Sequence, residues 1–286
     1  MLLSTKMESA AIILAGIGHA CWDYELAWMA SYDPDASILH MHWLRMAFMM
    51  IFLYIFSWRQ PVENRPWKWW VKFSLVGWVI PSLLYTMSVI WTGYRISVSF
   101  QSFIPLVVVA RTSATLTEEK CTALILVMCG TLCIWYAVSW EAELWQIWAA
   151  IIASTIQVIA SAEFFVMLKE SKCRSTVIAR GNALAVAIMF FSFVVWTPKH
   201  FTAITNNHID KWFFILAASA AAASIKYGLV AYFAKKMSAD GVAIFECVHP
   251  IATLFSDILR GKDSFELDDA AAVTFFTIGW ILYPKK

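Results

Sequence analysis

Charged residues are scarce in this chain of 286 residues. They make up 15% of the sequence, whereas an average soluble domain has about 25%. Hydrophobic residues make up 60%, and they fall into runs of about 20, the length of a helix that crosses a bilayer. The composition therefore excludes an ordinary soluble domain and predicts an all-α integral membrane protein.

Several motifs that would indicate other classes are missing. The net charge of +2 is too small to indicate a nucleic-acid partner. None of the six cysteines forms a Cys-x-x-Cys pair, so we expect no disulfide framework, no zinc site and no cofactor. Cys129 and Cys133 fit packing on one helix face, and a metal site at His40 and His42 would lack a third ligand. Without a nucleotide-binding loop or a hydrolase pattern, we expect neither an ATP-driven pump nor an enzyme.

Ten apolar segments are long enough to cross a bilayer. The first begins like a signal peptide, with Lys6 before the apolar run Ala10–Gly18, but the run continues to Met29, so we expect a retained helix. The connections are short, and no soluble domain is inserted. The predicted spans cover residues 9–30, 38–58, 70–92, 96–112, 121–139, 144–168, 175–197, 211–234, 240–260 and 268–284.

The loops between these spans carry Lys and Arg unevenly. If the N-terminus is cytoplasmic, most of the 22 Lys and Arg residues fall on the inner side, and few, such as Arg95 and Lys199, fall on the outer side. Cytoplasmic loops of membrane proteins carry such an excess. We therefore expect a multi-pass protein of the cell membrane (the inner membrane in a bacterium) with both termini in the cytoplasm.

Two of the predicted spans contain a proline that interrupts the helix. Pro105 releases the carbonyl of Gln101, and Pro250 releases that of Glu246. Hydrocarbon tolerates such a defect only where it is buried in protein or lines a wet cavity. Two broken helices, one in each half, therefore predict a binding site between internal repeats.

Other residues recur in the same order in the two halves, residues 1–140 and 141–286. With five spans in each half, the second copy enters the membrane from the opposite side, so we expect an inverted repeat. The matched positions are His19 and Gln157, Glu25 and Glu163, Arg45 and Arg180, Tyr85 and Tyr227, Pro105 and Pro250, and Gly130 and Gly279.

The sequence resembles the EamA-type drug/metabolite transporter superfamily. The resemblance rests on ten spans in two inverted halves, on Arg45 early in the second span, and on the loops Thr115–Lys120 and Lys262–Asp269 after the two prolines. It implies secondary transport or exchange by alternating access. It also implies a central cavity lined by the first four helices of each half, with the fifth and tenth helices outside. These two, with Gly130 and Gly279, could form a homodimer contact.

Charged residues within the spans predict two ion pairs. Glu25 and Arg45 lie about equally far from the loop between the first two spans, and Glu163 and Arg180 bracket the matching loop in the second half. We therefore expect the pairs Glu25–Arg45 and Glu163–Arg180 at mirrored depths. They either pin each hairpin or belong to the outer and inner gates.

Polar and aromatic residues near the middle of the membrane predict the substrate site, because ionisable groups there are costly. Glu246 is the first choice for a carboxyl that binds substrate or a proton; alternatively, it is a protonated carboxyl satisfied by His249 or Lys226. Lys226 is expected to contact Glu246, Asp257 or an anionic ligand group, and Asp257 to be solvated or to cap its helix. The candidate site residues are His19, Trp22, Tyr85, Trp91, Gln101, Gln157, Lys226, Tyr227, Glu246 and His249.

Carboxyls beside aromatic rings favour a cationic or zwitterionic ligand. The sequence therefore predicts a secondary transporter of a small polar metabolite, such as an amino acid or another amine, with proton or counter-substrate coupling. Substrates across the resembled family also include nucleotides and nucleotide sugars, so an exchanger of these or of a nucleoside derivative such as S-adenosylmethionine is an alternative. An intramembrane enzyme and a non-transporting subunit are alternatives of other classes.

Overall fold

The computed structural model describes residues 2–32, 38–58, 60–112, 114–138, 142–172, 174–191, 209–260 and 266–284. All regular structure in these residues is helical. The helical segments follow the apolar runs of the sequence. In chain order they are α1 (Leu2–Tyr32), α2 (Ile38–Ser57), α3 (Trp67–Ser74), η1 (Leu75–Val79), α4 (Ile80–Thr92), α5 (Tyr94–Ser99), η2 (Phe100–Phe103), α6 (Ile104–Thr112), α7 (Glu118–Ala137), α8 (Leu144–Glu170), α9 (Arg174–Met189), α11 (Ile209–Phe233), α12 (Ala239–Ala243), η4 (Ile244–Cys247), α13 (Val248–Leu259) and α14 (Leu267–Leu282).

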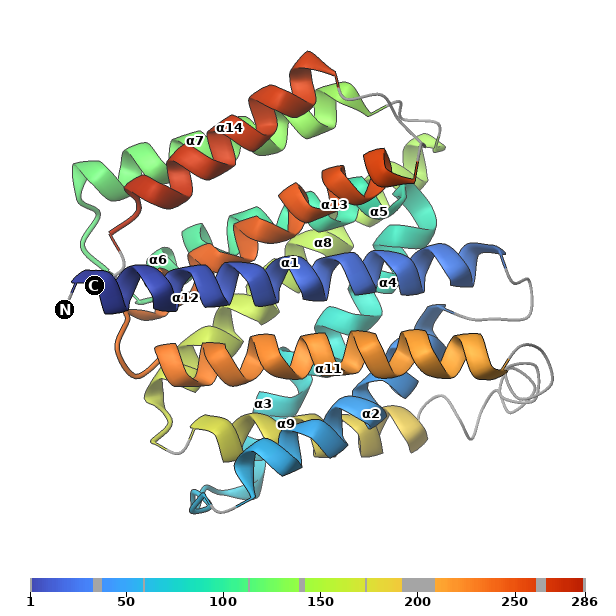
Figure 1. Cartoon of the computed structure of the whole chain (residues 1–286), viewed down its shortest axis with the longest axis vertical. Helices are drawn as coiled ribbons and strands as arrows, with labels where there is room; N and C mark the ends of the chain where they lie inside the picture. Colours follow the sequence, from blue (N-terminus) through green and yellow to red (C-terminus); the bar gives the residue numbers. More distant parts are fainter. Residues whose placement is uncertain are drawn as a thin grey trace.

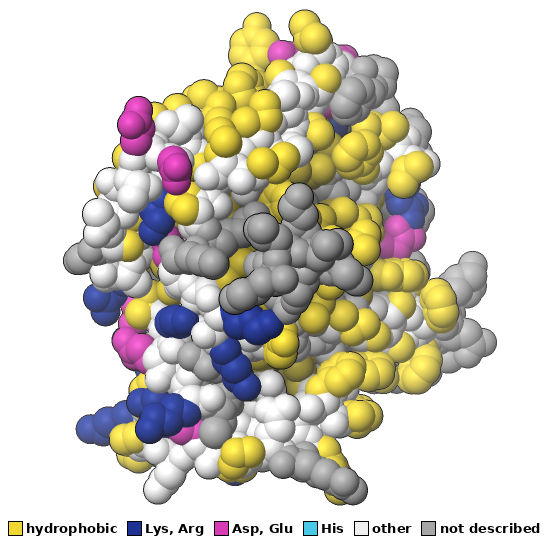
Figure 2. Space-filling model, turned by 60° about the vertical axis from the view of Figure 1, so that its left-hand side comes forward, with side chains coloured by type: hydrophobic (Ala, Val, Ile, Leu, Met, Phe, Trp, Pro, Cys, Tyr) yellow, Lys and Arg dark blue, Asp and Glu magenta, His cyan; other side chains and the backbone are white. Residues whose placement is uncertain are grey.

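Five helices of the described part are long and apolar enough to cross a membrane. They cover Trp67–Thr92, Glu118–Ala137, Leu144–Glu170, Phe213–Phe233 and Ala239–Leu259. Large apolar side chains are exposed on them, such as Ile125, Leu132 and Ile159, and Figure 2 shows apolar side chains over the flank of the molecule. A bilayer would cover such surface, so the architecture is that of a multi-pass membrane protein.

The bundle is layered around α1. This helix packs against α11 on one side and α13 on the other, α8 packs against α4 and α6, and α2 packs against α9 and α11. Figure 1 shows the helices running side by side, with the start of α1 and the end of α14 at the same end of the bundle.

The two spans that contain Pro105 and Pro250 change from α-helical to 3-10 geometry shortly before the proline. The 3-10 turn η2 contains Gln101 and ends two residues before Pro105, and η4 contains Glu246 and ends three residues before Pro250. A proline cannot donate the hydrogen bond that the carbonyl four residues earlier would accept, and a tighter turn accommodates the loss. The two turns contact each other, so both discontinuities lie in the middle of the fold.

A third irregularity lies between α3 and α4 and was not predicted. The π-helical turn η1 covers Leu75–Val79 and is followed by Pro81, which removes the donor for the carbonyl of Gly77. Single π-helical turns inside α-helices often occur at functional sites. This turn positions Trp78 toward the centre of the bundle, where its ring lies 4.6 Å from that of Tyr227.

The peripheral helices α7 and α14 pack against each other along their length (Figure 1). A Cβ atom added to Gly279 would lie 2.8 Å from the carbonyl oxygen of Ala123, and one added to Gly130 would lie 3.1 Å from the ring of Phe276. Both glycines are buried. They therefore serve close packing between α7 and α14 of one chain, and the homodimer contact expected at these two helices stays a prediction.

Replacing Gly279 with valine is expected to lower the free energy of unfolding by about 1–3 kcal/mol, the usual cost of overpacking. The carbonyl of Ala123 is backbone and cannot move aside without separating α7 from α14. Thermal unfolding of the purified protein measures the effect. Gly18→Ala is the matched control, because nothing lies within 4 Å of an added Cβ there. Equal stability of the two variants would contradict this account of the packing.

Candidate functional site

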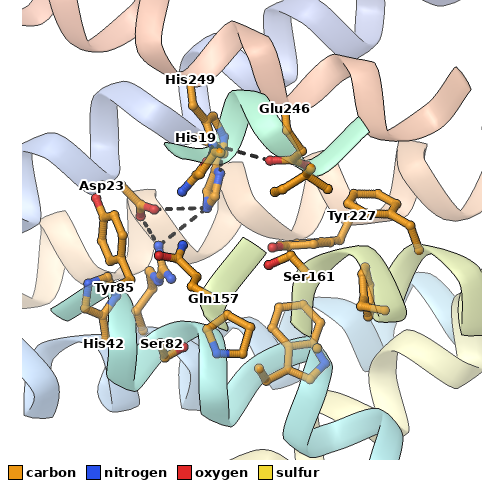
Figure 3. A pocket seen from close by; sticks show the side chains of 18 residues that line it. His19, Asp23, His42, Ser82, Tyr85, Gln157, Ser161, Tyr227, Glu246 and His249 are labelled. Atoms are coloured by element: carbon orange, nitrogen blue, oxygen red, sulfur yellow. Dashed lines mark hydrogen bonds and ion pairs between the residues drawn. The ribbon is translucent and has the colours of Figure 1, made fainter. Parts of the chain in front are cut away.

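A polar cavity lies where the two 3-10 turns meet α1, α2, α4, α8 and α11. Its volume is about 90 Å³, counted as positions that the centre of a water molecule can take. The side chains of both halves of the sequence line it (Figure 3). Charged and polar lining residues include His19, Asp23, His42, Arg45, Gln101, Gln157, Glu246 and His249.

One cluster of charges joins α1 to α2 on the wall of this cavity. Asp23 forms an ion pair with Arg45, accepts a hydrogen bond from the hydroxyl of Ser219 at 3.2 Å, and lies 3.3 Å from Nε2 of His19. Asp23 and Arg45 are each 9% exposed, and His19 is 4% exposed. Two opposite charges therefore lie deep in the protein with an imidazole beside them.

A second cluster joins α11 to η4 and α13. Lys226 donates a hydrogen bond to Glu246 at 2.8 Å, and its ammonium group lies 3.0 Å from Nε2 of His249. The other ring nitrogen of His249 contacts the side-chain oxygen of Gln101. Lys226 is only 1% exposed. The small residues before it, Ala217–Ser224, allow the helices to approach closely.

The two clusters are joined by a contact between imidazole rings. Nδ1 of His19 lies 3.1 Å from Nε2 of His249, and Figure 3 shows the two rings next to each other, with Glu246 and Asp23 on either side. A chain of polar contacts therefore runs from Asp23 in the first half of the sequence to Glu246 in the second. Burying such charges costs several kcal/mol for each ion, so a membrane protein that holds two buried ion pairs is expected to use them.

Four buried side chains on the cavity wall carry polar atoms without a hydrogen-bond partner among the described residues. These atoms are Oε1 of Gln157, both ring nitrogens of His42, Nε1 of Trp78 and Nε of Arg45. Buried polar atoms are rarely left unpaired in folded proteins. The cavity therefore offers both donors and acceptors to water or to a bound solute.

Most of the candidate residues predicted from the sequence lie at this cavity. Lys226 lies just behind the wall and contacts Glu246, one of the partners expected for it. Two tryptophans lie elsewhere: Trp22 packs against Phe214, and Trp91 packs against Trp145. The predicted residues on the wall are His19, Tyr85, Gln101, Gln157, Tyr227, Glu246 and His249.

The predicted pairing of Glu25 with Arg45 is wrong. Arg45 pairs with Asp23, whereas Glu25 pairs with Arg260 at the end of α13. Two residues along an α-helix differ by about 200° in direction, so Glu25 points away from α2 when Asp23 points toward it. The depth of a charge follows from its distance to the loop, but its direction does not.

The predicted pairing of Glu163 with Arg180 is also wrong. Glu163 accepts hydrogen bonds from Lys72 at 2.5 Å and from Arg111 at 3.0 Å, and the guanidinium of Arg180 lies over the ring of Trp70 at 5.7 Å. Both partners of Glu163 come from the first half of the chain. The acidic residue therefore joins the two halves instead of pinning one hairpin.

Asp257 was expected to be solvated or to cap its helix, and the first of these alternatives is wrong. It is 6% exposed, accepts a hydrogen bond from the hydroxyl of Tyr24, and forms an ion pair with Arg95 at 2.8 Å. Arg95 also lies 3.5 Å from Asp269. These contacts tie α1, α5, α13 and α14 together near one end of the bundle.

Asp23 is the main site residue that the sequence analysis missed. Its spacing of four residues from His19 places the two side chains on one face of α1, and this spacing could have identified it. The serines of the wall, Ser82 and Ser161, gave no such signal, because single serines are common in apolar helices. No group of three or more side chains suited to a metal ion occurs within the described ranges.

Comparisons with known proteins give the fold only. No family model matches the sequence, and no curated protein matches it. Among solved structures, 28 chains match. One, described only as "Crystal structure of protein", superposes with a TM-score of 0.69 over 96% of each chain at 11% sequence identity. The chain therefore shares its overall fold with solved proteins.

Proposed function

We propose that this protein is a secondary transporter of the EamA-type drug/metabolite class that moves a small polar metabolite with an amino group, such as an amino acid. The observation that carries the proposal is the polar cavity at the meeting point of two broken helices, with unpaired polar atoms on its wall and two buried ion pairs at it, Asp23–Arg45 and Lys226–Glu246. Broken helices that meet at mid-membrane are where secondary transporters bind their substrates.

The packing of the helices supports an inverted repeat of five spans. If α1 is exchanged with α8, α2 with α9, the span formed by α3, η1 and α4 with α11, the first broken helix with the second, and α7 with α14, the main packing contacts are preserved. Thus α1 packs against α11 and α13, as α8 packs against α4 and α6, and α2 packs against α9. Such symmetry allows one half to rock against the other around a fixed site.

The arrangement of the ends supports a cytoplasmic location for both termini. The start of α1 and the end of α14 lie at one end of the bundle (Figure 1). Figure 2, turned to bring that side of the molecule forward, shows Lys and Arg side chains gathered on it. An excess of Lys and Arg is typical of the cytoplasmic side.

The charges of the cavity favour a zwitterion as the substrate. Asp23 and Glu246 already have the cationic partners Arg45 and Lys226, so a ligand of one charge alone would leave an uncompensated charge in the protein. A zwitterion brings a carboxylate for Arg45 and an ammonium group for a carboxylate. The small volume of the cavity favours a solute of amino-acid size over a nucleotide.

Ligand-induced stabilisation of the purified protein tests the proposed function. The compounds are amino acids, quaternary amines, polyamines, nucleotides and nucleotide sugars. A ligand at a hundred times its dissociation constant adds about 2.7 kcal/mol to the free energy of unfolding. A zwitterionic amine is expected to stabilise the wild type and to have no such effect on Glu246→Gln, while Tyr136→Phe, on an exposed side chain, responds like the wild type. The same amine should enter liposomes only when they contain the protein. Flux equal to that of protein-free liposomes would contradict the proposal.

We propose further that two ion pairs between helices of different spans act as gates. Glu25 with Arg260 joins α1 to the end of α13, and Glu163 with Arg111 joins α8 to α6. The exchange of halves that relates the helices also relates these two pairs. They lie toward opposite ends of the bundle, so breaking one while the other holds would open the cavity to one side at a time.

Reversal of one charge in a gate is expected to lower flux, and reversal of both is expected to restore it. The variants are Glu25→Arg, Arg260→Glu and the double exchange. Both side chains are about a quarter exposed, at 25% and 26%, so the pair contributes at most about 1 kcal/mol to stability, and the fold should survive. Flux into liposomes and thermal unfolding are measured together. Additive losses of flux in the double variant would rule out this pair as a gate.

A further inference from the structure

We infer that His19 is a proton-binding site, and that the proton it takes up makes Arg45 available to a carboxylate of the substrate. The inference rests on the proposed function and adds to it the coupling ion and the group that responds to it. It is carried by the hydrogen-bonding requirements of two imidazole rings and the charges around them.

A neutral imidazole has one nitrogen that donates and one that accepts. Nδ1 of His249 contacts the side-chain oxygen of Gln101, and its Nε2 lies 3.0 Å from the ammonium group of Lys226. An ammonium group only donates. Nε2 of His249 is therefore an acceptor, and Nδ1 carries the hydrogen of this ring.

The tautomer of His249 determines what His19 must do. Nδ1 of His19 lies 3.1 Å from the accepting Nε2 of His249, so it needs a hydrogen. Nε2 of His19 lies 3.3 Å from a carboxylate oxygen of Asp23, toward which it would donate, and 3.4 Å from the guanidinium of Arg45, from which it would accept. A neutral ring with its hydrogen on Nδ1 accepts at Nε2, so it meets the contact with Arg45 and supplies no hydrogen to Asp23. One added proton on His19 lets both nitrogens donate, to His249 and to Asp23, and Nε2 can then no longer accept from Arg45.

When His19 is protonated, Lys226 can give up its contact with Nε2 of His249, because its positive charge is still neutralised by Glu246. Its ammonium group keeps the hydrogen bond to Glu246 at 2.8 Å. The lone pair on Nε2 of His249 can then accept the hydrogen of His19. Proton uptake therefore requires a shift of hydrogen bonds and leaves the second ion pair in place.

The charged or titratable groups that the described elements bring to His19 and His249 come from α1, α2, α11 and η4, and the polar side chain of Gln101 comes from η2. The groups are Asp23, His42, Arg45, Lys226, Tyr227 and Glu246. Among these groups, only Asp23 is an anion in contact with His19, so it is the counter-ion for an imidazolium at His19.

The added proton changes the role of Arg45. In the present arrangement the guanidinium of Arg45 compensates Asp23 and lies 3.4 Å from Nε2 of His19. An imidazolium at His19 repels Arg45 and supplies Asp23 with a second cation. Arg45 lines the cavity, and its Nε has no hydrogen-bond partner among the described residues. A carboxylate in the cavity would then pair with this guanidinium, and proton uptake and carboxylate binding would favour each other.

Nitrogen NMR of the ¹⁵N-histidine-labelled full-length protein in lipid nanodiscs tests the site without a substrate. The pH is varied between about 5 and 8, where histidine changes its charge. We expect one histidine whose two ring nitrogens both become protonated in this range, and we expect His19→Gln to remove that signal. Asp23→Asn removes the counter-ion and is expected to abolish the imidazolium signal over the same range. His40→Gln, a change on α2 away from the cavity wall, should leave it intact.

Two outcomes would overturn the inference. One is a His19 ring that stays singly protonated over the whole range, and the other is a titration of His19 that Asp23→Asn leaves unchanged. Because no solute is present, a failure here does not depend on whether the protein transports amines. Conversely, failure of the flux experiment with a normal titration of His19 would contradict the proposed function and leave the proton site standing.

Discussion

Replacing Lys226 with methionine is expected to lower the free energy of unfolding by about 3–5 kcal/mol, the usual cost of removing one partner of a buried ion pair. Lys226 is 1% exposed and donates to Glu246 at 2.8 Å. Methionine fills similar space, so the loss comes from the charge and not from a cavity. The carboxylate of Glu246 would be left in the protein interior without its cation. Chemical or thermal unfolding in detergent measures the change.

A second substitution separates this effect from general damage. Adding Glu246→Gln to Lys226→Met removes the unpaired charge, and the double variant should recover most of the lost stability, since buried pairs can be replaced by neutral groups at little cost. Lys72→Met is the matched control. Lys72 also bonds a glutamate, Glu163, at 2.5 Å, but its side chain is 54% exposed, so its loss should cost at most about 1 kcal/mol. Similar losses in Lys226→Met and Lys72→Met would show that the pair at Lys226 is not isolated from solvent.

The positions of the helices could be predicted because they depend on local properties of the sequence. A run of about 20 apolar residues is read directly, and the effect of Pro105 and Pro250 on the carbonyls of Gln101 and Glu246 is a matter of covalent geometry. The π-helical turn at Leu75–Val79 escaped prediction. Pro81 indicates an interrupted helix there, but a proline alone does not distinguish a kink from an inserted residue.

The ion-pair partner of a site residue could be predicted only where the sequence offers few residues of opposite charge at the same depth. A buried lysine in an apolar helix requires an anion, and Glu246 was among the few acidic residues placed near mid-membrane. The pairing of Glu25 with Arg45 failed because it used depth without the direction around the helix. The position of His19 indicates the direction in which the polar face of α1 points, because Asp23 lies one turn further along on the same face.

Contacts between the halves could not be predicted from the sequence. His19 and His249 are 230 positions apart and still touch. Their contact depends on how α1 is rotated against α13, and this rotation is set by the packing of many apolar residues and not by a motif. The same holds for Glu163, whose partners Lys72 and Arg111 come from helices that the sequence does not place beside α8.

Replacing Asp23 with leucine is expected to lower the free energy of unfolding by about 3–5 kcal/mol and to abolish transport. The substitution leaves the guanidinium of Arg45 buried without its carboxylate, and it removes the acceptor for His19 and Ser219. Thermal unfolding and flux into liposomes are measured on the same preparations. Asp23→Asn keeps the shape and an acceptor oxygen, so it should cost less stability than leucine but lose transport equally.

The neighbouring acid on the same helix provides the control for Asp23. Glu25 lies two residues further along α1, and its pair with Arg260 is about a quarter exposed, at 25% and 26%. Glu25→Gln should therefore cost at most about 1 kcal/mol. A double-mutant cycle of Asp23→Asn with Arg45→Met should give an interaction energy of about 0.5–3 kcal/mol, the range for residues in contact. Two results would contradict the account of a buried ion pair between Asp23 and Arg45. One is additive effects of the two changes on the free energy of unfolding, and the other is a loss of stability in Glu25→Gln as large as that in Asp23→Asn. In that case Arg45 would have to be compensated by another anion, and the loss of transport in Asp23→Asn would have to be explained by the contact with His19 alone.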